Sequence, residues 1–344
     1  MKHHLNTLFI QTDGAYLAKD GRALRVLIDG EEKLRTPVHT LGSIVCFGRV
    51  NASTSALALC AEEGVAVSFC SASGRLLARA TGFTPGNVLL RRDQYRAADD
   101  LSRSAAIAAP IVAAKVANAR TALLRAARDH GDADGSLAEA AASLASSARA
   151  ALACQNLDAL RGIEGDAASA YFAVFDRLVS LPPPDRDAFR LAGRTRRPPL
   201  DRTNALLSFL YAMLTHDARA ACEAAGLDPA VGFLHRDRPG RPSLALDLIE
   251  ELRAFLCDRL ALSLINRRQV NAADFDIQPT GAVRMTDAAR RTVVIAYQRR
   301  KQEEITHPYL QERVSVGLLV HLQARLLSRM LRGELDTYPA FIWK

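Results

Sequence analysis

The residues best able to bind a metal lie in three separate segments of the chain. Glu164 stands in the run R-G-I-E-G at 161–165, His235 lies in a later turn rich in Arg, Pro and Gly, and Asp247 and Glu250 follow shortly after. One imidazole among several carboxylates favours a hard or borderline ion such as Mg²⁺ or Mn²⁺, whereas a structural zinc site usually recruits thiolates. These four side chains could together hold one divalent metal ion.

The spacing of these residues supports that interpretation without settling it. Asp247 and Glu250 are three residues apart in a helix expected after Pro242, so both side chains should emerge on one face. His235 precedes that helix and can fold back over it, while Glu164 must come from elsewhere in the fold. The alternative is that Glu164 caps the start of its own helix, that the two acids form a solvated face, and that His235 is an ordinary loop histidine.

Length and composition indicate an ordinary globular protein. The chain has 344 residues, of which 49% are hydrophobic, enough for about two domains with full-sized cores. We find neither a signal peptide nor an apolar run of about 20 residues, so we expect a cytoplasmic protein with no membrane segment. The six cysteines form no C-x-x-C pair and lie among apolar neighbours, which indicates buried, reduced thiols and no disulfide framework.

The charge of the chain favours a polyanionic partner but does not establish one. The net charge is +8 and the pI is near 9.4, and many proteins this basic bind no nucleic acid. A basic connector follows the prolines at 182–184, and it is either a solvated loop or a track for phosphates. Its arginines are Arg186, Arg190, Arg194, Arg196, Arg197 and Arg202.

The first 84 residues are typical of a small β-rich domain. Turn signals at Asp13-Gly14 and Asp29-Gly30 each predict a β-hairpin. A short helix is expected over 53–63, and another hairpin arm is expected to begin at Gly74. The runs expected to form strands are 7–12, 15–19, 24–28, 44–47 and 65–69.

Beyond a breaker cluster at 84–86, the chain becomes rich in alanine with apolar residues at helical spacing. We therefore expect an α+β protein with a β-rich domain over 1–84, a linker over 85–90 and an all-α domain over 91–344. The expected helices cover 91–129, 136–154, 165–180, 203–224, 243–266, 286–304 and 309–332.

Three segments resemble a known family, the large catalytic subunit of the CRISPR adaptation integrase. They are L-R-G-I-E-G-D-A-A-S-A-Y-F at 160–172, N-A-L-L-S-F-L-Y-A-M-L at 204–214, and G-F-L-H-R-D-R-P-G-R-P-S-L-A-L-D-L-I-E-E at 232–251. The resemblance runs nearly end to end and is nearest to members that accompany type I systems, with subtype I-C favoured. It implies a β-rich domain that mediates dimerisation and a helical domain that holds the metal and binds DNA.

In that family a glutamate in an E-G step, a histidine and an acid in a D-x-x-[DE] step hold the ion. The resemblance therefore implies that Glu164, His235 and Glu250 are the catalytic metal ligands, with Asp247 as an accompanying ligand, direct or through water. The implied reaction is metal-dependent transesterification that inserts protospacer 3′-ends into the repeat array, with an associated endonuclease activity. The implied partners are double-stranded DNA, a second copy of the chain, and a smaller adaptation subunit that joins two dimers into a heterohexamer.

Several other residues are candidates for DNA contact. Tyr171 and Tyr211 either belong to the core or, as the resemblance suggests, lie near the DNA path, where a ring can stack on an unpaired base. The arginines that flank His235 either neutralise the nearby carboxylates or, as we favour, bind phosphates. The full set is Lys115, Tyr171, Asn204, Tyr211, Arg196, Arg197, Arg236, Arg238 and Arg241.

Two other functions are compatible with the same residues. A stand-alone metal-dependent nuclease acting on branched DNA would use the same ligands with water as the nucleophile, and it would give only shorter strands. A non-catalytic architectural DNA-binding protein would use the positive charge alone. In that case Glu164→Ala would leave every activity unchanged.

Overall fold

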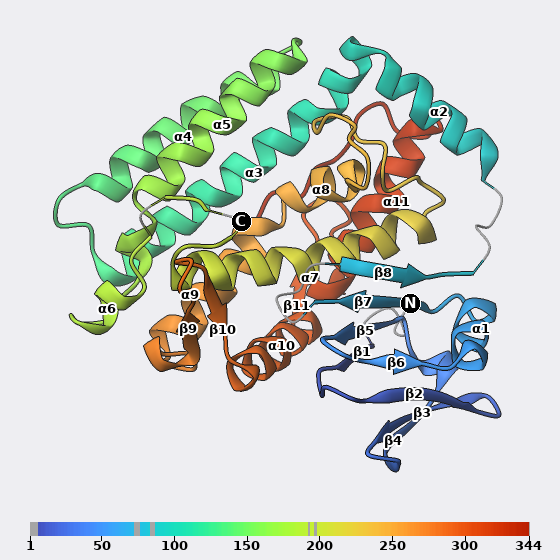
Figure 1. Ribbon diagram of the computed structural model, residues 1–344. Coiled ribbons are helices and arrows are strands. Elements are labelled where there is room, and N and C mark those ends of the chain that lie inside the picture. The colour runs from blue at the N-terminus through green and yellow to red at the C-terminus, as the bar shows by residue number, and fades with distance from the viewer. Residues whose placement is uncertain (1–5, 72–75, 83–86, 192, 196–197, 344) are drawn as a thin grey trace. The chain divides into compact units, whose positions relative to one another are not determined.

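The computed structural model describes residues 6–71, 76–82, 87–191, 193–195 and 198–343. The chain forms two compact units, which we describe one at a time (Figure 1). The first unit contains the chain up to Gly86 together with Val293–Glu303 and Val316–Leu318. The second unit contains the remainder.

The first unit is built from strands and two helical segments. Its strands are β1 (Thr7–Ile10), β2 (Tyr16–Asp20), β3 (Ala23–Ile28), β4 (Glu31–Pro37), β5 (Ser43–Phe47), β6 (Asn51–Ala52), β7 (Ala66–Cys70) and β8 (Leu76–Ala80). One sheet has the order β1-β5-β7-β8, and the other has the order β4-β3-β2-β6. The helix α1 (Thr54–Glu62) begins where Ser53 Oγ accepts a hydrogen bond from the Ala56 amide, so the expected strand-helix-strand unit around it is confirmed.

The hairpin predicted at Asp13-Gly14 is wrong. β1 pairs in parallel with β5, whereas β2 lies in the other sheet. The Asp13 carboxylate and the Gly14 amide instead bind the backbone of Arg49, at 2.9 and 2.8 Å. The sequence of β1 is continuously apolar, which is typical of a strand inside a parallel sheet and not of a surface hairpin.

The hairpin predicted at Asp29-Gly30 is confirmed. It joins β3 to β4 in an antiparallel pair. Asp29 has a φ of 52° and Gly30 a φ of 82°, and two successive positive φ angles are what a tight two-residue hairpin turn requires. The arm expected to begin at Gly74 falls partly outside the described residues, and β8 pairs with β7 beyond them.

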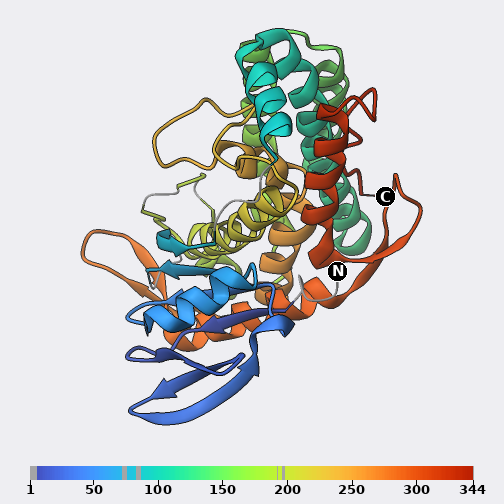
Figure 2. The same cartoon turned by 90° about the vertical axis from the view of Figure 1, so that its right-hand side faces the viewer.

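The second unit is mainly helical, and its long helices pack side by side (Figures 1 and 2). Its α-helices are α2 (Val88–Asp99), α3 (Leu101–His130), α4 (Ser136–Ala153), α5 (Leu157–Ala173), α6 (Asp185–Ala188), α7 (Arg202–Ala224), α8 (Ser243–Glu250), α9 (Arg259–Asn266) and α11 (Leu319–Leu331), while α10 (Asp287–Gln302) contributes residues to both units. The short helical turns of the chain are Val38–Thr40, Phe175–Leu178, Ala272–Asp274 and Val316–Leu318, and Arg253–Asp258 is a π-helix.

The predicted fold class, a β-rich part followed by a helical part, is confirmed. The helical part is nevertheless not purely helical, because two small antiparallel hairpins interrupt it. They are formed by β9 (Phe275–Ile277) with β10 (Val283–Met285), and by β11 (Glu304–Thr306) with β12 (Arg313–Ser315).

Several predicted helix boundaries are corrected. The first stretch is two helices that meet at Asp100, whose carboxylate accepts hydrogen bonds from the amides at the start of α3. The helix expected at 165 begins at Leu157, where Asn156 supplies the N-terminal cap. Glu164 therefore lies in the middle of α5 and does not cap a helix. The stretch expected from 309 becomes α-helical at Leu319, after β12.

By length and composition alone, α3 could cross a membrane. However, 67% of its most apolar window is buried inside the protein, which is what the core helix of a globular domain shows. The helix continues through Pro110, which the alanine-rich sequence around it tolerates. α3 is thus the central helix of the second unit, and α4 and α5 pack along it.

Candidate metal centre

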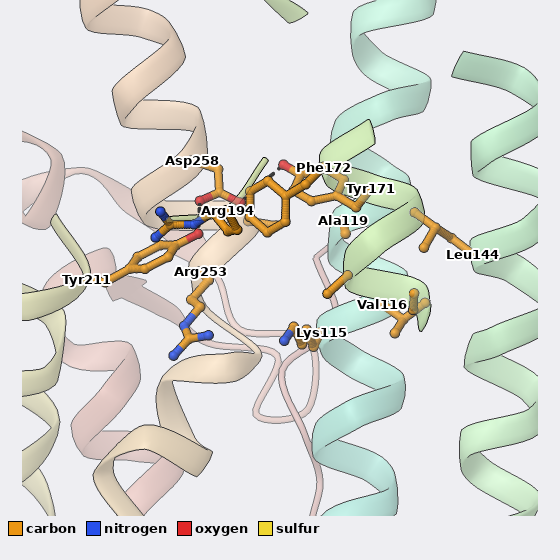
Figure 3. A pocket seen from close by; sticks show the side chains of 13 residues that line it. Lys115, Val116, Ala119, Leu144, Tyr171, Phe172, Arg194, Tyr211, Arg253 and Asp258 are labelled. Atoms are coloured by element: carbon orange, nitrogen blue, oxygen red, sulfur yellow. Dashed lines mark hydrogen bonds between the residues drawn. The ribbon is translucent and has the colours of Figure 1, made fainter. Parts of the chain in front are cut away.

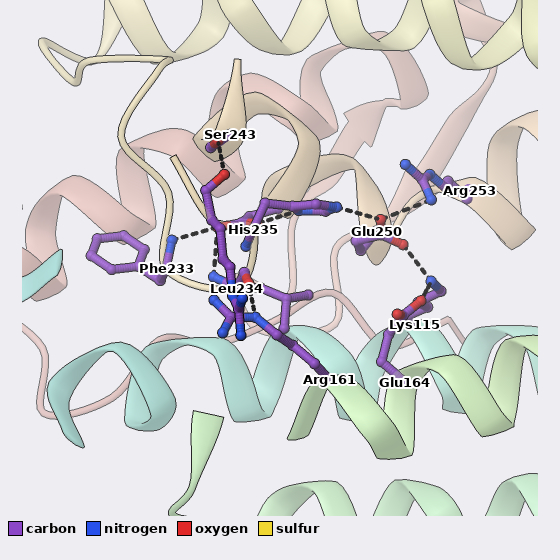
Figure 4. Close-up of polar contacts among 11 residues, drawn as sticks. Lys115, Arg161, Glu164, Phe233, Leu234, His235, Ser243, Glu250 and Arg253 are labelled. Carbon is purple, nitrogen blue, oxygen red and sulfur yellow. Dashed lines mark hydrogen bonds and ion pairs between the residues drawn. The ribbon is translucent and has the colours of Figure 1, made fainter. Parts of the chain in front are cut away.

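Three helices of the second unit bring two carboxylates to one ammonium group (Figure 4). Glu164 comes from α5, Glu250 is the last residue of α8, and Lys115 comes from α3. Lys115 Nζ lies 2.6 Å from Glu250 Oε2 and also forms an ion pair with Glu164 Oε1. Two residues predicted to bind the metal are thus neighbours, and Lys115, predicted to bind DNA, lies between them.

His235 lies on the other side of Glu250, held in place by Asp247. Its Nδ1 is 2.6 Å from Asp247 Oδ1, and its Nε2 is 3.8 Å from Glu250 Oε1. Because a carboxylate only accepts hydrogen bonds, Nδ1 carries the proton and Nε2 presents its lone pair toward Glu250. This is the arrangement by which proteins orient a metal-binding imidazole.

The Asp247 carboxylate is completely buried, and both of its oxygens are engaged. Oδ2 accepts from the amides of Phe233 and Leu234 at 2.6 and 3.0 Å, and Oδ1 accepts from the His235 amide at 3.0 Å as well as from the ring. The loop can approach this closely because residue 232 is glycine. A Cβ on Gly232 would lie 2.7 Å from Asp247 Oδ2.

Glu250 is a buried carboxylate that stays ionised. It is 2% exposed, and Arg253 Nη1 lies 2.8 Å from its Oε1. Burial alone would raise the pKa of Glu250, but the positive charges of Arg253, Lys115 and, if protonated, His235 outweigh it and lower the pKa to about 2. The centre therefore holds a permanent negative charge that needs cations around it.

The donors at this place fit a divalent ion. Two carboxylates already share one cationic group, and Glu250 Oε2 is buried without a hydrogen bond of normal geometry. A third donor, His235 Nε2, faces the same carboxylate. In the part of the chain that the structure describes, no three such side chains converge into a ready-made metal cluster, since Lys115 occupies the space between them. Carboxylates with one imidazole suit Mg²⁺ or Mn²⁺.

The two glycines of the R-G-I-E-G run leave the surface beside Glu164 bare. Both Gly162 and Gly165 are exposed, and both lie within α5. A Cβ added at either position would meet no atom within 4 Å. A bulky ligand can therefore come closer to Glu164 along this face than a helix with ordinary side chains would allow.

The expectation that Tyr171 stacks on an unpaired base is corrected (Figure 3). The ring is 4% exposed, and its hydroxyl donates to Asp258 Oδ2 at 3.1 Å. Tyr211 is less buried and donates to Asp258 Oδ1 at 2.6 Å, with the guanidinium of Arg253 at 4.9 Å over its ring. Both rings line a small apolar pocket that also borders Lys115. The core-packing alternative holds for Tyr171.

Asn204 is likewise a structural residue and not a DNA contact. Its side chain is completely buried. Its Nδ2 donates to the Gly193 carbonyl at 2.7 Å, and its Oδ1 accepts from the Thr195 amide and from Arg194. Arg194 in turn lies over the rings of Tyr211 and Phe172. A motif asparagine thus holds part of the basic connector against the helices.

The arginines beside His235 differ in their surroundings. Arg236 and Arg161 both donate to Asp158 Oδ1, at 2.9 and 2.6 Å, at the edge of a second pocket that is also lined by His235. Arg238 is exposed, and Arg241 is half-buried. The remaining predicted DNA contacts, Arg196 and Arg197, lie outside the described residues.

Two functional candidates were missed by sequence reasoning. Arg253 binds the Glu250 carboxylate, and Asp258 holds both tyrosines. Burial raises the pKa of Asp258 to about 6, although hydrogen bonds from the tyrosines and the nearby arginines oppose this. Their spacing from Glu250 follows a π-helix, so no α-helical pattern in the sequence indicates that they point toward the site.

Comparisons with known proteins agree with this site and fold. The family described as CRISPR associated protein Cas1 matches residues 8–299. The CRISPR-associated endonuclease Cas1 1 of Chlorobaculum tepidum is 54% identical over the full length of both chains. A solved Cas1 protein from Thermotoga maritima is 25% identical, with a TM-score of 0.79 over 95% of this chain and 97% of that one. A Cas6-RT-Cas1–Cas2 complex matches with 25% identity and a TM-score of 0.81 over 98% of this chain and 36% of that one.

These matches cover nearly the whole chain and exceed what a shared fold alone would give. Cas1 endonucleases are generally metal-dependent, in accord with the donors around Glu250. The chain therefore belongs to the Cas1 family, the CRISPR-associated endonucleases that act as integrases in CRISPR adaptation.

Proposed function

We propose that Glu164, His235 and Glu250 hold one divalent ion, Mg²⁺ or Mn²⁺, where this chain joins DNA 3′-ends to a phosphodiester of the repeat array. One observation carries the proposal. The Glu164 and Glu250 carboxylates share a single cationic group, and the free nitrogen of His235 faces the same carboxylate. A bound divalent ion would lower the pKa of a DNA 3′-hydroxyl and neutralise charge developing on the attacked phosphate.

Asp247 positions the site and does not need to bind the ion itself. Its two oxygens already accept three backbone amides and the His235 ring proton. Direct coordination would require giving up at least one of these buried hydrogen bonds. This resolves the choice between Asp247 and Glu250 in favour of Glu250.

The basic residues of the site have separate tasks in this proposal. Arg253 keeps Glu250 ionised from within the protein. Lys115 holds the two carboxylates together when no metal is bound, and it is released from them toward the DNA phosphate when a metal takes their charge. Arg161 and Arg236, now joined by Asp158, border the pocket beside His235 and can receive a phosphate group there.

The partners of the chain follow from the same proposal. A net charge of +8 suits double-stranded DNA, both protospacer and repeat. A Cas1–Cas2 complex among the similar structures supports a smaller Cas2 partner, assembled with homodimers of this chain into a heterohexamer. We propose that dimerisation uses the β-rich part, that the complex works in the cytoplasm, and, from sequence resemblance alone, that it serves a type I-C system.

An integration assay tests the proposal. The purified chain, its Cas2 partner, a short duplex with free 3′-ends and a supercoiled plasmid bearing the repeat are mixed with Mn²⁺ or with EDTA. We expect joined products that require the metal and that Glu164→Ala and His235→Ala abolish without loss of DNA binding. Asp166→Asn, an exposed acid on the same helix as Glu164, is the matched control and should behave as wild type.

The products also separate the alternative functions. Products longer than the input strands show joining, whereas only shorter strands would indicate a nuclease that uses water. If wild type and Glu164→Ala bind DNA equally and neither joins nor cuts, the metal centre has no catalytic role and the chain acts as an architectural protein.

A further inference from the structure

A second set of buried contacts holds the backbone next to Glu250, and a segment far along the chain makes them. α8 ends at Glu250, the next two residues form a turn, and the π-helix begins at Arg253. The regular hydrogen-bond pattern of an α-helix stops at this point. The helix alone therefore does not fix the direction of the Glu250 side chain.

Glu251 anchors this break through its side chain. The carboxylate is completely buried, and it accepts hydrogen bonds from the Phe341 amide, the Tyr338 hydroxyl and the Gln323 amide group. Two of these three donors belong to residues 338–343, which we call the docking segment. Gln323 also donates to the Tyr338 hydroxyl at 2.7 Å, so the donors are themselves connected.

Asn118 joins the docking segment to the same break from the side of α3. Its Nδ2 donates to the Glu251 carbonyl at 2.7 Å and to the Phe341 carbonyl at 2.9 Å, and its Oδ1 accepts from the Trp343 amide at 2.7 Å. Asn118 follows Lys115 by three residues, so both side chains leave α3 on one face. Neighbouring positions on α3 thus meet consecutive residues, Glu250 and Glu251.

Trp343 closes the docking segment onto the helices. The guanidinium of Arg125 lies 4.0 Å from a Trp343 ring centroid and that of Arg259 lies 4.3 Å away, and the ring meets Phe255 edge-on. Phe255 also contacts Phe341 and belongs to the π-helix. Cations against an indole ring are among the stronger contacts of this kind.

We propose that the docking segment is a positioning element of the metal centre. By binding Glu251 and Asn118 it sets the orientation of Glu250, and so determines how tightly the site binds a divalent ion. This inference rests on the proposed role of Glu250 as a metal ligand. Asn118 and Trp343 act through Glu251 and contact neither metal nor DNA in this role.

Trp343 is the single tryptophan of the chain, so the wild-type protein reports on its own docking segment. Its fluorescence is recorded while Mg²⁺ is added, and its quenching by acrylamide is measured at each concentration. We expect a saturable change in emission and reduced quenching as the metal fixes Glu250. Glu250→Gln should abolish the change. Emission that does not respond to Mg²⁺, while Mn²⁺ binding is demonstrated separately, would overturn the coupling.

Substitutions test the same coupling from the other direction. The free Mn²⁺ signal in electron paramagnetic resonance gives the metal affinity of Trp343→Ala, of Asn118→Ala and of the conservative Trp343→Phe. We expect the first two to weaken Mn²⁺ binding by about tenfold, the scale typical of residues that orient metal ligands, and Trp343→Phe to restore most of it. Ile342→Ala, an exposed residue of the same segment, is the matched control.

The outcomes separate this inference from the proposed function. If Glu164→Gln and Glu250→Gln keep wild-type Mn²⁺ affinity, the metal site itself is wrong. If they lose it while Trp343→Ala and Asn118→Ala bind as wild type does, the metal site stands and the positioning role fails. Thermal melts followed by circular dichroism show whether a variant is folded, and the wild-type fluorescence decides if one is not.

Discussion

Asp247→Asn distinguishes a positioning carboxylate from a metal ligand. The substitution keeps the size of the side chain but replaces one acceptor oxygen with an NH₂ group. That group would face the amides or the ring proton now bound by the carboxylate, so about two of the four hydrogen bonds would be lost. Hydrogen bonds to charged groups contribute about 1.5–3 kcal/mol each, so we expect the free energy of unfolding to fall by about 3–6 kcal/mol.

The effect of Asp247→Asn on catalysis should depend on the metal concentration. Without the carboxylate, His235 loses the partner that fixes its protonated nitrogen, and loss of such a partner lowers metal affinity about 10- to 100-fold. We expect the Mn²⁺ concentration that gives half-maximal joining to rise by that factor, with the rate recovering at saturating Mn²⁺. The assay is strand joining over a Mn²⁺ series below the melting temperature of the variant.

A matched control and one result decide the matter. Asp237→Asn removes an exposed acid from the same loop and should leave both stability and Mn²⁺ dependence unchanged. If Asp247→Asn remains inactive at every Mn²⁺ concentration, as we expect for Glu250→Gln, then Asp247 is a direct ligand. Unchanged stability and activity would refute the whole account of this loop.

Further predictions concern the charges, the glycines and the tyrosines around the centre. Lys115→Met should destabilise the metal-free protein, because it leaves Glu164 and Glu250 facing each other, and Mn²⁺ should raise its melting temperature more than that of wild type. The pKa of Glu250 lies at about 2 against an ordinary value of 4.5, so its ionised form contributes about 3 kcal/mol above pH 4.5 that is lost as the pH falls toward 2; urea unfolding of wild type and Glu250→Gln across this range should converge, and a constant difference would contradict the assignment. Gly162→Ala and Gly165→Ala should each stabilise α5 by about 0.5–1 kcal/mol yet slow joining if DNA approaches Glu164 along this face, and stable variants with full activity would place the DNA elsewhere. Tyr171→Phe leaves Asp258 with one donor fewer in a buried place and should cost about 1–3 kcal/mol without changing DNA affinity, whereas weaker binding would show that the ring does meet DNA.

The fold class and the three segments around the site could be anticipated from the sequence, because each depends on local patterns. Apolar periodicity marks helices, and Asp29-Gly30 marks a turn whose geometry needs positive φ angles. Glu164, His235 and Glu250 are recognisable because their residue types match a known chemistry. That they lie close together in space, however, follows only from how α3, α5 and α8 pack.

What could not be anticipated depends on long-range pairing. The Asp13-Gly14 signal is a real turn, but the partner that β1 chooses lies more than thirty residues away in β5. Glycines at 162 and 165 suggested a helix boundary, whereas tertiary packing keeps α5 helical through both. Tyr171 and Asn204 sit in motif segments, and nothing in a motif distinguishes a residue that meets the substrate from one that shapes the core.

The π-helix after Glu250 means that chain length is part of this site. A π-turn holds an additional residue that an α-helix would not accommodate. Deleting one residue between 253 and 258 would let the segment become an ordinary α-helix without exposing any apolar surface of its own. Everything after it would then turn by about 100°, so Asp258 would leave the two tyrosines and Arg259 would leave Trp343. In this chain a change of length at one position, with no change of residue type, would detach both supports of the helix from the metal centre.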